Sequence, residues 1–414
     1  MNASVNVARR IPMVQLDHLP SVMVEDVVND GLCTGCGLCE PMSRGRYRMT
    51  NVEAIGFRPV KVNPAVASLD VGSFCPGIFL TRDQEQEDGH SAALWEDWGP
   101  VLEVWEGFAC DADVRHRGSS GGAVTALAQF AANALGMNVV GTVASKKDPF
   151  VNEVGGADRL SDMPGSRYAP SSPCQVLSPE DESAPTAFIG KPCDVAGLYN
   201  LDRLRRPHPD SFSIGIFCAG VPSVAGNRQL VREQGLDPDQ VSGLKYRGEG
   251  WPGLWRARTH NGQTREMTYA DSWHYLQRFR QWRCYVCPDH TGEFADISVG
   301  DPWYKANREG EGKSLIVVRT KKGQTMLRQA MEQGFIEAVR LDDDKLPQSQ
   351  PGLLETRSSI VGRLFAMRLF RLTQARFTNM GLDRAWRRVG VRTKIRAVGA
   401  TAKRLVKKGV VTWH

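Results

Sequence analysis

The chain has 414 residues and a formal net charge of +6, with the apolar and charged fractions, 41% and 24%, of an ordinary globular protein. No apolar run reaches the roughly 20 residues of a membrane-spanning helix, and residues 1–20 lack the apolar core and cleavage site of a signal peptide. We therefore expect two or three domains in a cytoplasmic chain. Thiols stay reduced there, so ten cysteines favour metal ligation or catalysis over disulfides.

An N-terminal segment, residues 1–90, is rich in turns and holds four cysteines, three of them in CTGCGLC (33–39). Three thiols at this spacing favour a [4Fe–4S] cluster, because a looped chain can place consecutive thiolates on different corner irons. Zinc sites usually draw thiolates in pairs from two knuckles. We expect Cys33, Cys36 and Cys39 as ligands, with Cys75 of FCPG as the fourth; a zinc knuckle or free thiols is the alternative.

Residues 91–350 follow an alternating α/β pattern. VLEVWEGFA (101–109) and MNVVGTVA (137–144) are predicted strands, and residues 123–135 between them have the apolar spacing of a helix. This order predicts a βαβ unit, with parallel pairing of the two strands and a right-handed crossover. Further strands are predicted at 186–189, 212–218, 294–300 and 314–320, with an amphipathic helix at 321–334.

A glycine turn, GSSGG, precedes the first of these helices and comprises Gly118, Ser119, Ser120, Gly121 and Gly122. Exposed N–H groups at a helix N-terminus, capped by Ser119 or Ser120, favour a phosphate. The motif is not the dinucleotide fingerprint, and an ordinary tight turn is the alternative. The loops SRYAPSSP (166–173) and KYRGEGWPG (245–253) suit a flat anionic ligand, with Arg167 or Arg247 on its phosphate, or are packed surface loops.

A second set of four cysteines is dispersed along the chain. Cys193 begins a predicted helix, Cys218 ends a predicted strand, and Cys284 and Cys287 form the knuckle CYVC. The spacing leaves open zinc, a second [4Fe–4S] cluster or no ligand. Cys110 and Cys174 remain, and both are expected to be small buried residues.

The C-terminal segment, residues 351–414, is predicted to be helical and basic. From Arg357 onward it has fifteen Lys or Arg and one acid, Asp383. Arginines among apolar residues favour contact with an anionic membrane, here the inner membrane surface, or with an acidic partner such as ferredoxin. A solvated helical extension packed on the body is the alternative. No nucleic-acid partner is expected, since no binding module is recognisable.

Several motifs occur in one order over roughly residues 30–350: CTGCGLCE, GSSGG, SRYAPS, GKPCDVAGL, FCAG, KYRGEGWPG, CYVCPDHTGEFADISVGDPW and GKSLIVVRTKKG. Through them the chain resembles the coenzyme F-420 hydrogenase/dehydrogenase beta-subunit family, whose members are iron–sulfur flavoproteins. The resemblance implies FAD near the glycine turn and near the loops of Arg167, Tyr168 and Arg247, and Lys191 is a further candidate near the cofactor. It also favours a second [4Fe–4S] cluster over zinc on Cys193, Cys218, Cys284 and Cys287.

The expected fold is α/β (α+β). It has a ferredoxin-like iron–sulfur segment (1–90), a mixed-sheet flavin domain containing the βαβ unit (91–350) and a basic helical extension (351–414). The expected protein is an oxidoreductase in which electrons enter at the N-terminal cluster, pass to the second cluster and reach FAD. The flavin would exchange hydride with coenzyme F-420 or an organic substrate, and ferredoxin or reduced F-420 would be the donor.

Two other functions stay open at this point. One is a zinc-stabilised scaffold in a polysaccharide-synthesis system. The other is an electron-transfer subunit that requires a catalytic partner subunit. The sequence assigns no catalytic residue.

Overall fold

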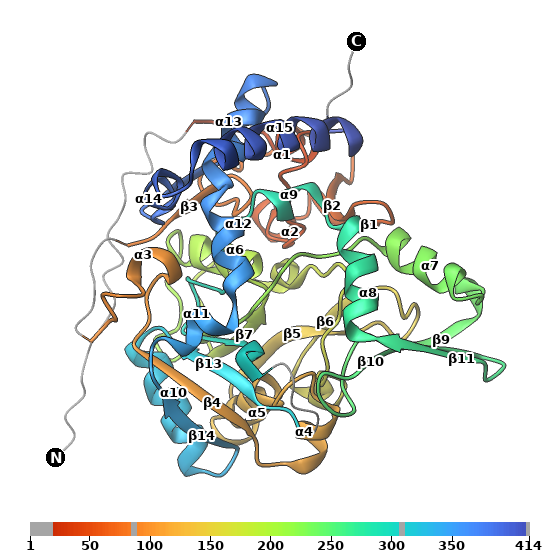
Figure 1. The fold of residues 1–414 in the computed structure, drawn as a ribbon, viewed down its shortest axis with the longest axis vertical. Coiled ribbons are helices and arrows are strands. Elements are labelled where there is room, and N and C mark those ends of the chain that lie inside the picture. The colour runs from red at the N-terminus through yellow and green to blue at the C-terminus, as the bar shows by residue number, and fades with distance from the viewer. Residues whose placement is uncertain (1–19, 84–88, 306–310, 411–414) are drawn as a thin grey trace.

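A computed structural model of the chain describes residues 20–83, 89–305 and 311–410. The expectation of no signal peptide concerns residues 1–19, which lie outside this description. A sheet of eight strands forms the centre of the molecule, in the order β14–β4–β13–β12–β8–β7–β5–β6 (Figure 1). In chain order these are β4 (Glu103–Ala109), β5 (Asn138–Ala144), β6 (Asn152–Gly155), β7 (Thr186–Gly190), β8 (Phe212–Ile216), β12 (Ile297–Gly300), β13 (Ser314–Val318) and β14 (Ile336–Leu341).

The sheet is mixed, as expected. Strands β5, β7, β8 and β12 are parallel neighbours, whereas β13, β4, β14 and β6 each join by antiparallel pairing. Strand β13 is buried along its whole length, which fits a sheet covered on both faces. The predicted mixed α/β class is confirmed.

The expected pairing of the first two predicted strands is wrong. Strands β4 and β5 run in the same direction, but β13, β12, β8 and β7 lie between them. The neighbours of β4 are instead β13 and β14, two strands from late in the chain. Closeness in sequence therefore does not decide which strands become neighbours here.

Helices cover both sides of the sheet. Helix α5 (Ala123–Gln129) continues as a π-helical stretch, Phe130–Ala134, and α10 (Lys321–Glu332) is capped by the side chain of Thr320. Helix α6 (Pro192–Asp202) follows β7 directly. The other helices of this region are α3 (Trp95–Trp98), α4 (Ala112–Arg117), α9 (Trp282–Tyr285) and α11 (Lys345–Ser349).

A smaller three-stranded sheet stands beside the large one (Figure 1). It is formed by β9 (Val241–Lys245), β10 (Leu254–Thr259) and β11 (Thr264–Thr268). Helices α7 (Val224–Glu233) and α8 (Tyr269–Leu276) pack with it around a separate apolar core that includes Tyr246 and Trp255. This unit brings the side chains of α8 toward the large sheet.

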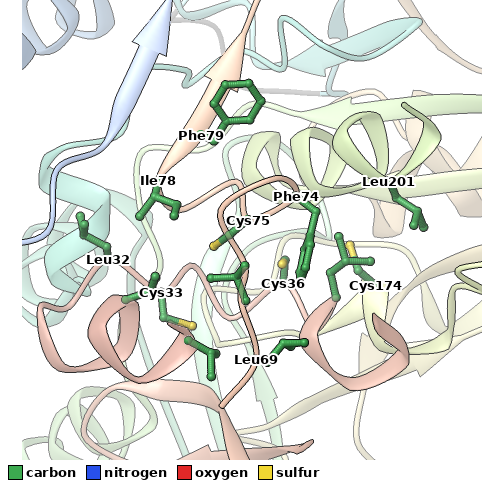
Figure 2. Packing of buried hydrophobic residues seen from close by; sticks show 14 of the residues in the cluster. Leu32, Cys33, Cys36, Leu69, Phe74, Cys75, Ile78, Phe79, Cys174 and Leu201 are labelled. Atoms are coloured by element: carbon green, nitrogen blue, oxygen red, sulfur yellow. The ribbon is translucent and has the colours of Figure 1, made fainter. Parts of the chain in front are cut away.

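The described parts of the N-terminal and C-terminal segments pack together. The N-terminal segment contains α1 (Val24–Asn29), α2 (Cys39–Met42), β1 (Tyr47–Val52), β2 (Gly56–Lys61) and β3 (Phe79–Thr81). The C-terminal segment contains α12 (Pro351–Ser358), α13 (Ile360–Leu369), β15 (Arg376–Thr378), α14 (Leu382–Arg387) and α15 (Val391–Lys407). Strand β15 pairs in parallel with β3. Met367 and Leu405 share one core with Cys33 and Cys75, and Figure 2 shows the two cysteines within that core.

The basic C-terminal segment is thus integrated into the body, with Leu405 fully buried. Within the described ranges, no helix has the length and apolar character needed to cross a membrane.

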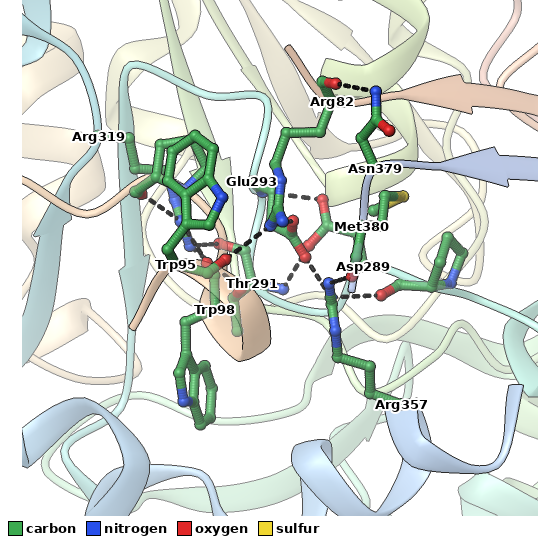
Figure 3. Close-up of polar contacts among 12 residues, drawn as sticks. Arg82, Trp95, Trp98, Asp289, Thr291, Glu293, Arg319, Arg357, Asn379 and Met380 are labelled. Carbon is green, nitrogen blue, oxygen red and sulfur yellow. Dashed lines mark hydrogen bonds and ion pairs between the residues drawn. The ribbon is translucent and has the colours of Figure 1, made fainter. Parts of the chain in front are cut away.

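A buried ion-pair network holds this C-terminal segment in place (Figure 3). The carboxylate of Glu293 pairs with Arg82, at 3.2 Å, and with Arg357 of α12. Asp289 accepts hydrogen bonds from the main-chain N–H groups of Thr291, Gly292 and Glu293. These contacts join three parts of the chain that are far apart in sequence.

Glu293→Gln should lower the free energy of unfolding by roughly 3–5 kcal/mol, because it leaves two buried arginines without their counter-charge. Denaturant titration would measure the loss. Glu266→Gln is the control: Glu266 forms an exposed pair with Arg256, and its loss should cost less than about 1 kcal/mol. Equal losses in the two variants would contradict a structural role for the network.

Candidate functional site

A cavity of about 260 Å³ opens at the carboxyl ends of the parallel strands. Its walls include Thr142 of β5, Lys191 after β7, Ile216 and Phe217 at the end of β8, and Asp301 after β12. Ligands of α/β proteins commonly bind at this edge of a sheet. The topology therefore places loops that are distant in sequence around one candidate ligand site.

The glycine turn lies at this cavity, between α4 and α5. Gly118, Ser119, Ser120 and Gly122 line it. The expectation that Ser119 or Ser120 caps the helix is wrong: the N-cap of α5 is Gly122, with φ +75°. The Ser119 hydroxyl instead accepts a hydrogen bond from the N–H of Ser166, and that of Ser120 lies 2.9 Å from the Ser314 hydroxyl.

Gly121 does not line the cavity. Its N–H donates to the Ser314 hydroxyl at 2.9 Å, and a Cβ at this position would lie 2.5 Å from the carbonyl oxygen of Gly107. Gly121 therefore allows the turn to pack closely against β4.

Both predicted arginines are close to the cavity but bind groups of the protein itself. Arg167 donates to the side chain of Asn152 and to the carbonyl oxygens of Pro149 and Leu244. Arg247 forms two hydrogen bonds of 2.8 Å to Asp301 and one of 2.7 Å to the carbonyl oxygen of Ser119. Their evident role is to hold the surrounding loops, with Arg247 tying the glycine turn to the end of β12.

Aromatic side chains form another wall. Tyr168, one of the residues expected near the cofactor, lines the cavity, and Tyr269, Trp273 and Trp303 join it. The Tyr269 and Trp303 rings are stacked, with centroids 5.6 Å apart and planes at 7°. Sequence reasoning missed the two residues of α8, although the stretch TYADSWHYL places Tyr269 and Trp273 four residues apart, on one face of a helix.

Lys191 connects the cavity to the cysteines. Its ammonium group donates to Ser171, at 2.8 Å, and to Asp194, at 2.5 Å. Burial alone would lower the pKa of Lys191, but the Asp194 carboxylate and the nearby Cys193 outweigh it and raise this pKa above its ordinary value. A positive charge is therefore held between the cavity and the second cysteine set.

The four dispersed cysteines, Cys193, Cys218, Cys284 and Cys287, line one smaller cavity of about 30 Å³. Burial raises the pKa of Cys218 to about 12 and that of Cys287 to about 11. The N–H of Gly220 donates to Cys218 Sγ and the N–H of Val221 to Cys284 Sγ, both at 3.4 Å. Cys218, Gly220 and Val221 also line the larger cavity, so the two cavities adjoin.

His290 also lines the small cavity. Burial lowers the pKa of His290 to about 4, so its ring is neutral at ordinary pH. Its Nδ1 lies 2.8 Å from the carbonyl oxygen of Cys218, whereas its buried Nε2 has no hydrogen-bond partner among the described residues.

The N-terminal cysteines also come together. Cys33, Cys36 and Cys75 are buried near one another (Figure 2). Cys39 begins α2 close by. Burial raises the pKa values of the Cys33, Cys39 and Cys75 thiols. Cys36 differs, because a hydrogen bond from the Cys174 thiol lowers its pKa.

Helix α6 separates the two thiol sets by about one turn. Gly197 follows Cys193 by four residues, and a Cβ on Gly197 would lie 3.7 Å from Cys36 Sγ and 3.5 Å from Cys174 Sγ. Thr34 of the N-terminal loop lines the small cavity as well. The N-terminal set, the second set and the large cavity therefore follow one another in space.

No three His, Cys, Asp or Glu side chains in the described ranges are placed to hold a single metal ion. The thiolates of a [4Fe–4S] cluster, in contrast, each bind a different iron.

The two remaining cysteines differ from each other. Cys174 is fully buried as expected and lies beside Cys36. The expected burial of Cys110 is wrong: it is exposed, because it follows the last residue of β4 at the rim of the sheet.

A mixed α/β sheet with buried thiol sets next to a ligand cavity suits a redox protein. The chain belongs to the coenzyme F420 hydrogenase/dehydrogenase beta-subunit family: the family's N-terminal model matches residues 104–178 and its C-terminal model matches residues 184–344. The family resemblance deduced from the motifs is thereby confirmed. The family is one of electron-transfer oxidoreductases.

Individual relatives agree with this assignment. The chain is 27% identical to the coenzyme F420 hydrogenase subunit beta of Methanococcus voltae, over 59% of this chain and 85% of the relative. It is 24% identical to the protein of the same name from Methanothermobacter thermautotrophicus, over 62% and 88%. A chain of the F420-reducing [NiFe] hydrogenase complex from Methanosarcina barkeri shares the fold, with a TM-score of 0.52 at 17% identity over 67% of this chain and 95% of that one.

Asp301→Asn should destabilise the cavity wall by roughly 3–5 kcal/mol, because the buried Arg247 would lose its carboxylate partner. Thermal unfolding would report the loss, and inorganic pyrophosphate should recover part of it by supplying an anion to Arg247. Asp239→Asn removes an exposed partner of Arg228 and should have little effect. An Asp301→Asn variant as stable as the parent would show that Arg247 is neutralised by other groups.

Proposed function

We propose that the chain is an iron–sulfur flavoprotein that relays electrons between two [4Fe–4S] clusters and FAD, and whose flavin exchanges hydride with coenzyme F-420 or an organic substrate. The observation that carries this proposal is the spatial order of the three sites. The large cavity adjoins the second thiol set at Cys218, Gly220 and Val221, and that set lies one turn of α6 from Cys36.

The two thiol sets fit clusters chemically. Each supplies four cysteines, and iron would replace the thiol protons that burial otherwise retains. Positive charge is available to offset an anionic cluster. The charge of Lys191 favours the thiolate forms of Cys193 and Cys218, and the charge of Arg283 favours those of Cys75 and Cys287. The N–H groups of Gly220 and Val221 donate toward sulfur, as is usual around iron–sulfur centres.

The large cavity fits a flavin nucleotide. The glycine turn supplies main-chain N–H groups for phosphate, and the aromatic wall of Tyr168, Tyr269, Trp273 and Trp303 suits a planar ring. Arg167 and Arg247 would hold the loops that shape the site, as their internal hydrogen bonds indicate.

Clusters carry electrons singly, and a flavin converts them to hydride. The chain's own residues would position these groups: α6 keeps the thiol sets close, and Lys191 holds positive charge between the second set and the cavity. The relatives named coenzyme F420 hydrogenase subunit beta support F-420 as hydride partner and a catalytic partner subunit. Reduced cysteines fit a cytoplasmic location, and ferredoxin or reduced F-420 is the proposed donor.

Cys36→Ser and Cys284→Ser should each remove about four of about eight irons while leaving flavin bound, since each set would hold its own cluster. Iron, sulfide and flavin assays on protein purified without oxygen would show this. Cys110→Ser, at an exposed thiol outside both sets, should keep all the iron. Loss of flavin with iron retained in either cluster variant would count against the relay.

Ile216→Trp should reduce bound flavin about tenfold or more by filling the large cavity, with iron unchanged. Ile216 lines that cavity and is 39% exposed, so the larger ring need not disturb the core. The matched control is Leu254→Trp, because Leu254 is 42% exposed on β10 and does not line the cavity. Normal flavin content in Ile216→Trp would place the flavin elsewhere.

A further inference from the structure

Three cations surround one tyrosine next to the second thiol set. The guanidinium carbons of Arg280 and Arg404 lie 4.8 and 4.6 Å from the centroid of the Tyr285 ring, and Lys408 Nζ lies 5.3 Å from it. Arg363 of α13 donates to the carbonyl oxygen of Tyr285. We call Arg280, Arg363, Arg404 and Lys408 the cationic surface.

These charges have few counter-charges within the described chain. Arg280 donates to the carbonyl oxygens of Gln277 and Ala219, and Lys408 donates to those of Arg278 and Arg280. Burial, together with Arg404 and Arg280, lowers the pKa of Arg363 to about 10, and burial also lowers that of Lys408. The charges of Arg404 and Arg280 affect the pKa of Arg363 more than the carboxylate of Glu355 does, so like charges are crowded together here.

The cationic surface is next to the cysteine cavity. Tyr285 directly follows Cys284, and Cys284 acts electrostatically on Lys408. Gly220, which lines the cavity, packs against both neighbours: a Cβ there would lie 2.3 Å from Arg280 Cδ and 3.4 Å from Cys284 Cβ. Arg280 and Cys284 thus both lie against the main chain of Gly220.

The cationic surface continues outward through exposed basic residues. Lys403 and Lys407 on α15 and Arg278 after α8 are exposed. Three of its four members lie beyond the residues that the family models match: Arg363 in α13, and Arg404 and Lys408 at the last turn and C-cap of α15. The C-terminal segment therefore adds positive charge beside a cavity that the family region builds.

We propose that the cationic surface docks a small, acidic, one-electron carrier protein of the iron–sulfur class, which exchanges electrons directly with the second thiol set. This rests on the proposed function. In each exchange one electron leaves the reduced carrier, which is oxidised, and reduces the centre held by Cys193, Cys218, Cys284 and Cys287; no bond or proton moves. Charge complementarity selects the partner and speeds its approach.

A protein partner fits this surface better than a membrane does. The cations gather around a half-buried ring at the C-terminal end of α15, where they cannot insert into lipid. The exposed apolar residues of the helix, Val391 and Ile395, lie nearer its other end, roughly 14–26 Å from Arg404 and Lys408 at 1.5 Å per residue. The location beside Cys284 also removes the need for the longer path through the N-terminal set.

The test measures binding of the iron-loaded full chain to an oxidised, acidic [2Fe–2S] ferredoxin by calorimetry at low and high salt. Arg404→Glu/Lys408→Glu should weaken ferredoxin binding at least about tenfold. Salt at roughly 0.5 M should weaken ferredoxin binding by the parent chain to a similar extent. Arg392→Glu/Arg396→Glu, with the same charge change at the other end of α15, should bind nearly as the parent does. Lys407→Glu, on the exposed face of α15, should cause a smaller loss of ferredoxin affinity. This single variant replaces the double variant in the test if the double variant fails to fold.

Iron assayed in the same samples separates this proposal from the preceding one. Parent-like ferredoxin affinity in the double variant and in Lys407→Glu, with iron present, would overturn the docking surface alone. The docking surface would also be overturned if the parent chain did not bind ferredoxin but bound phosphatidylglycerol vesicles, because α15 would then be a membrane contact. A parent chain without iron would overturn the proposed function itself.

Discussion

The sharing of Glu293 by two arginines is the constraint on which much of the structure depends. Arg82 follows β3 near the start of the chain, and Arg357 lies in α12 near its end. Glu293 itself belongs to the loop that follows Cys287. One buried carboxylate thus holds the N-terminal thiol segment and the basic C-terminal helices against the loop that completes the second thiol set, and it needs both partners because an unpaired buried charge is costly.

As a consequence, the large cavity, the second thiol set and the N-terminal thiol set lie next to one another in space. The large cavity is formed at the carboxyl ends of β5, β7, β8 and β12. Helices α6 and α9 contribute cysteines to the second thiol set, and the N-terminal set lies against α6. Gly197 of α6 marks this contact, since a Cβ there would lie at van der Waals distance from both Cys36 Sγ and Cys174 Sγ. The same packing places the end of α15 outside Cys284, so the residues beyond the family region have a defined place next to a redox site.

Much of this could be predicted from the sequence, because apolar periodicity and cysteine spacing are local signals. The predicted strands at 186–189 and 314–320 correspond to β7 and β13, and eight of the nine residues expected at the cofactor do line the large cavity. Strand neighbours could not be predicted, since β13 and β14, which flank β4, come from late in the chain. Nor could the roles of Gly121 or Tyr269, because each depends on contacts between segments far apart in sequence.

The most direct test of the account is the cofactor content of the unmodified chain, purified without oxygen. Iron, acid-labile sulfide, zinc and flavin would be assayed together with the visible spectrum. The account predicts about eight irons, about as many sulfides and one FAD per chain, since each thiol set would hold one [4Fe–4S] cluster. Zinc without flavin or sulfide would contradict it and would leave a structural scaffold as the function of these cysteines.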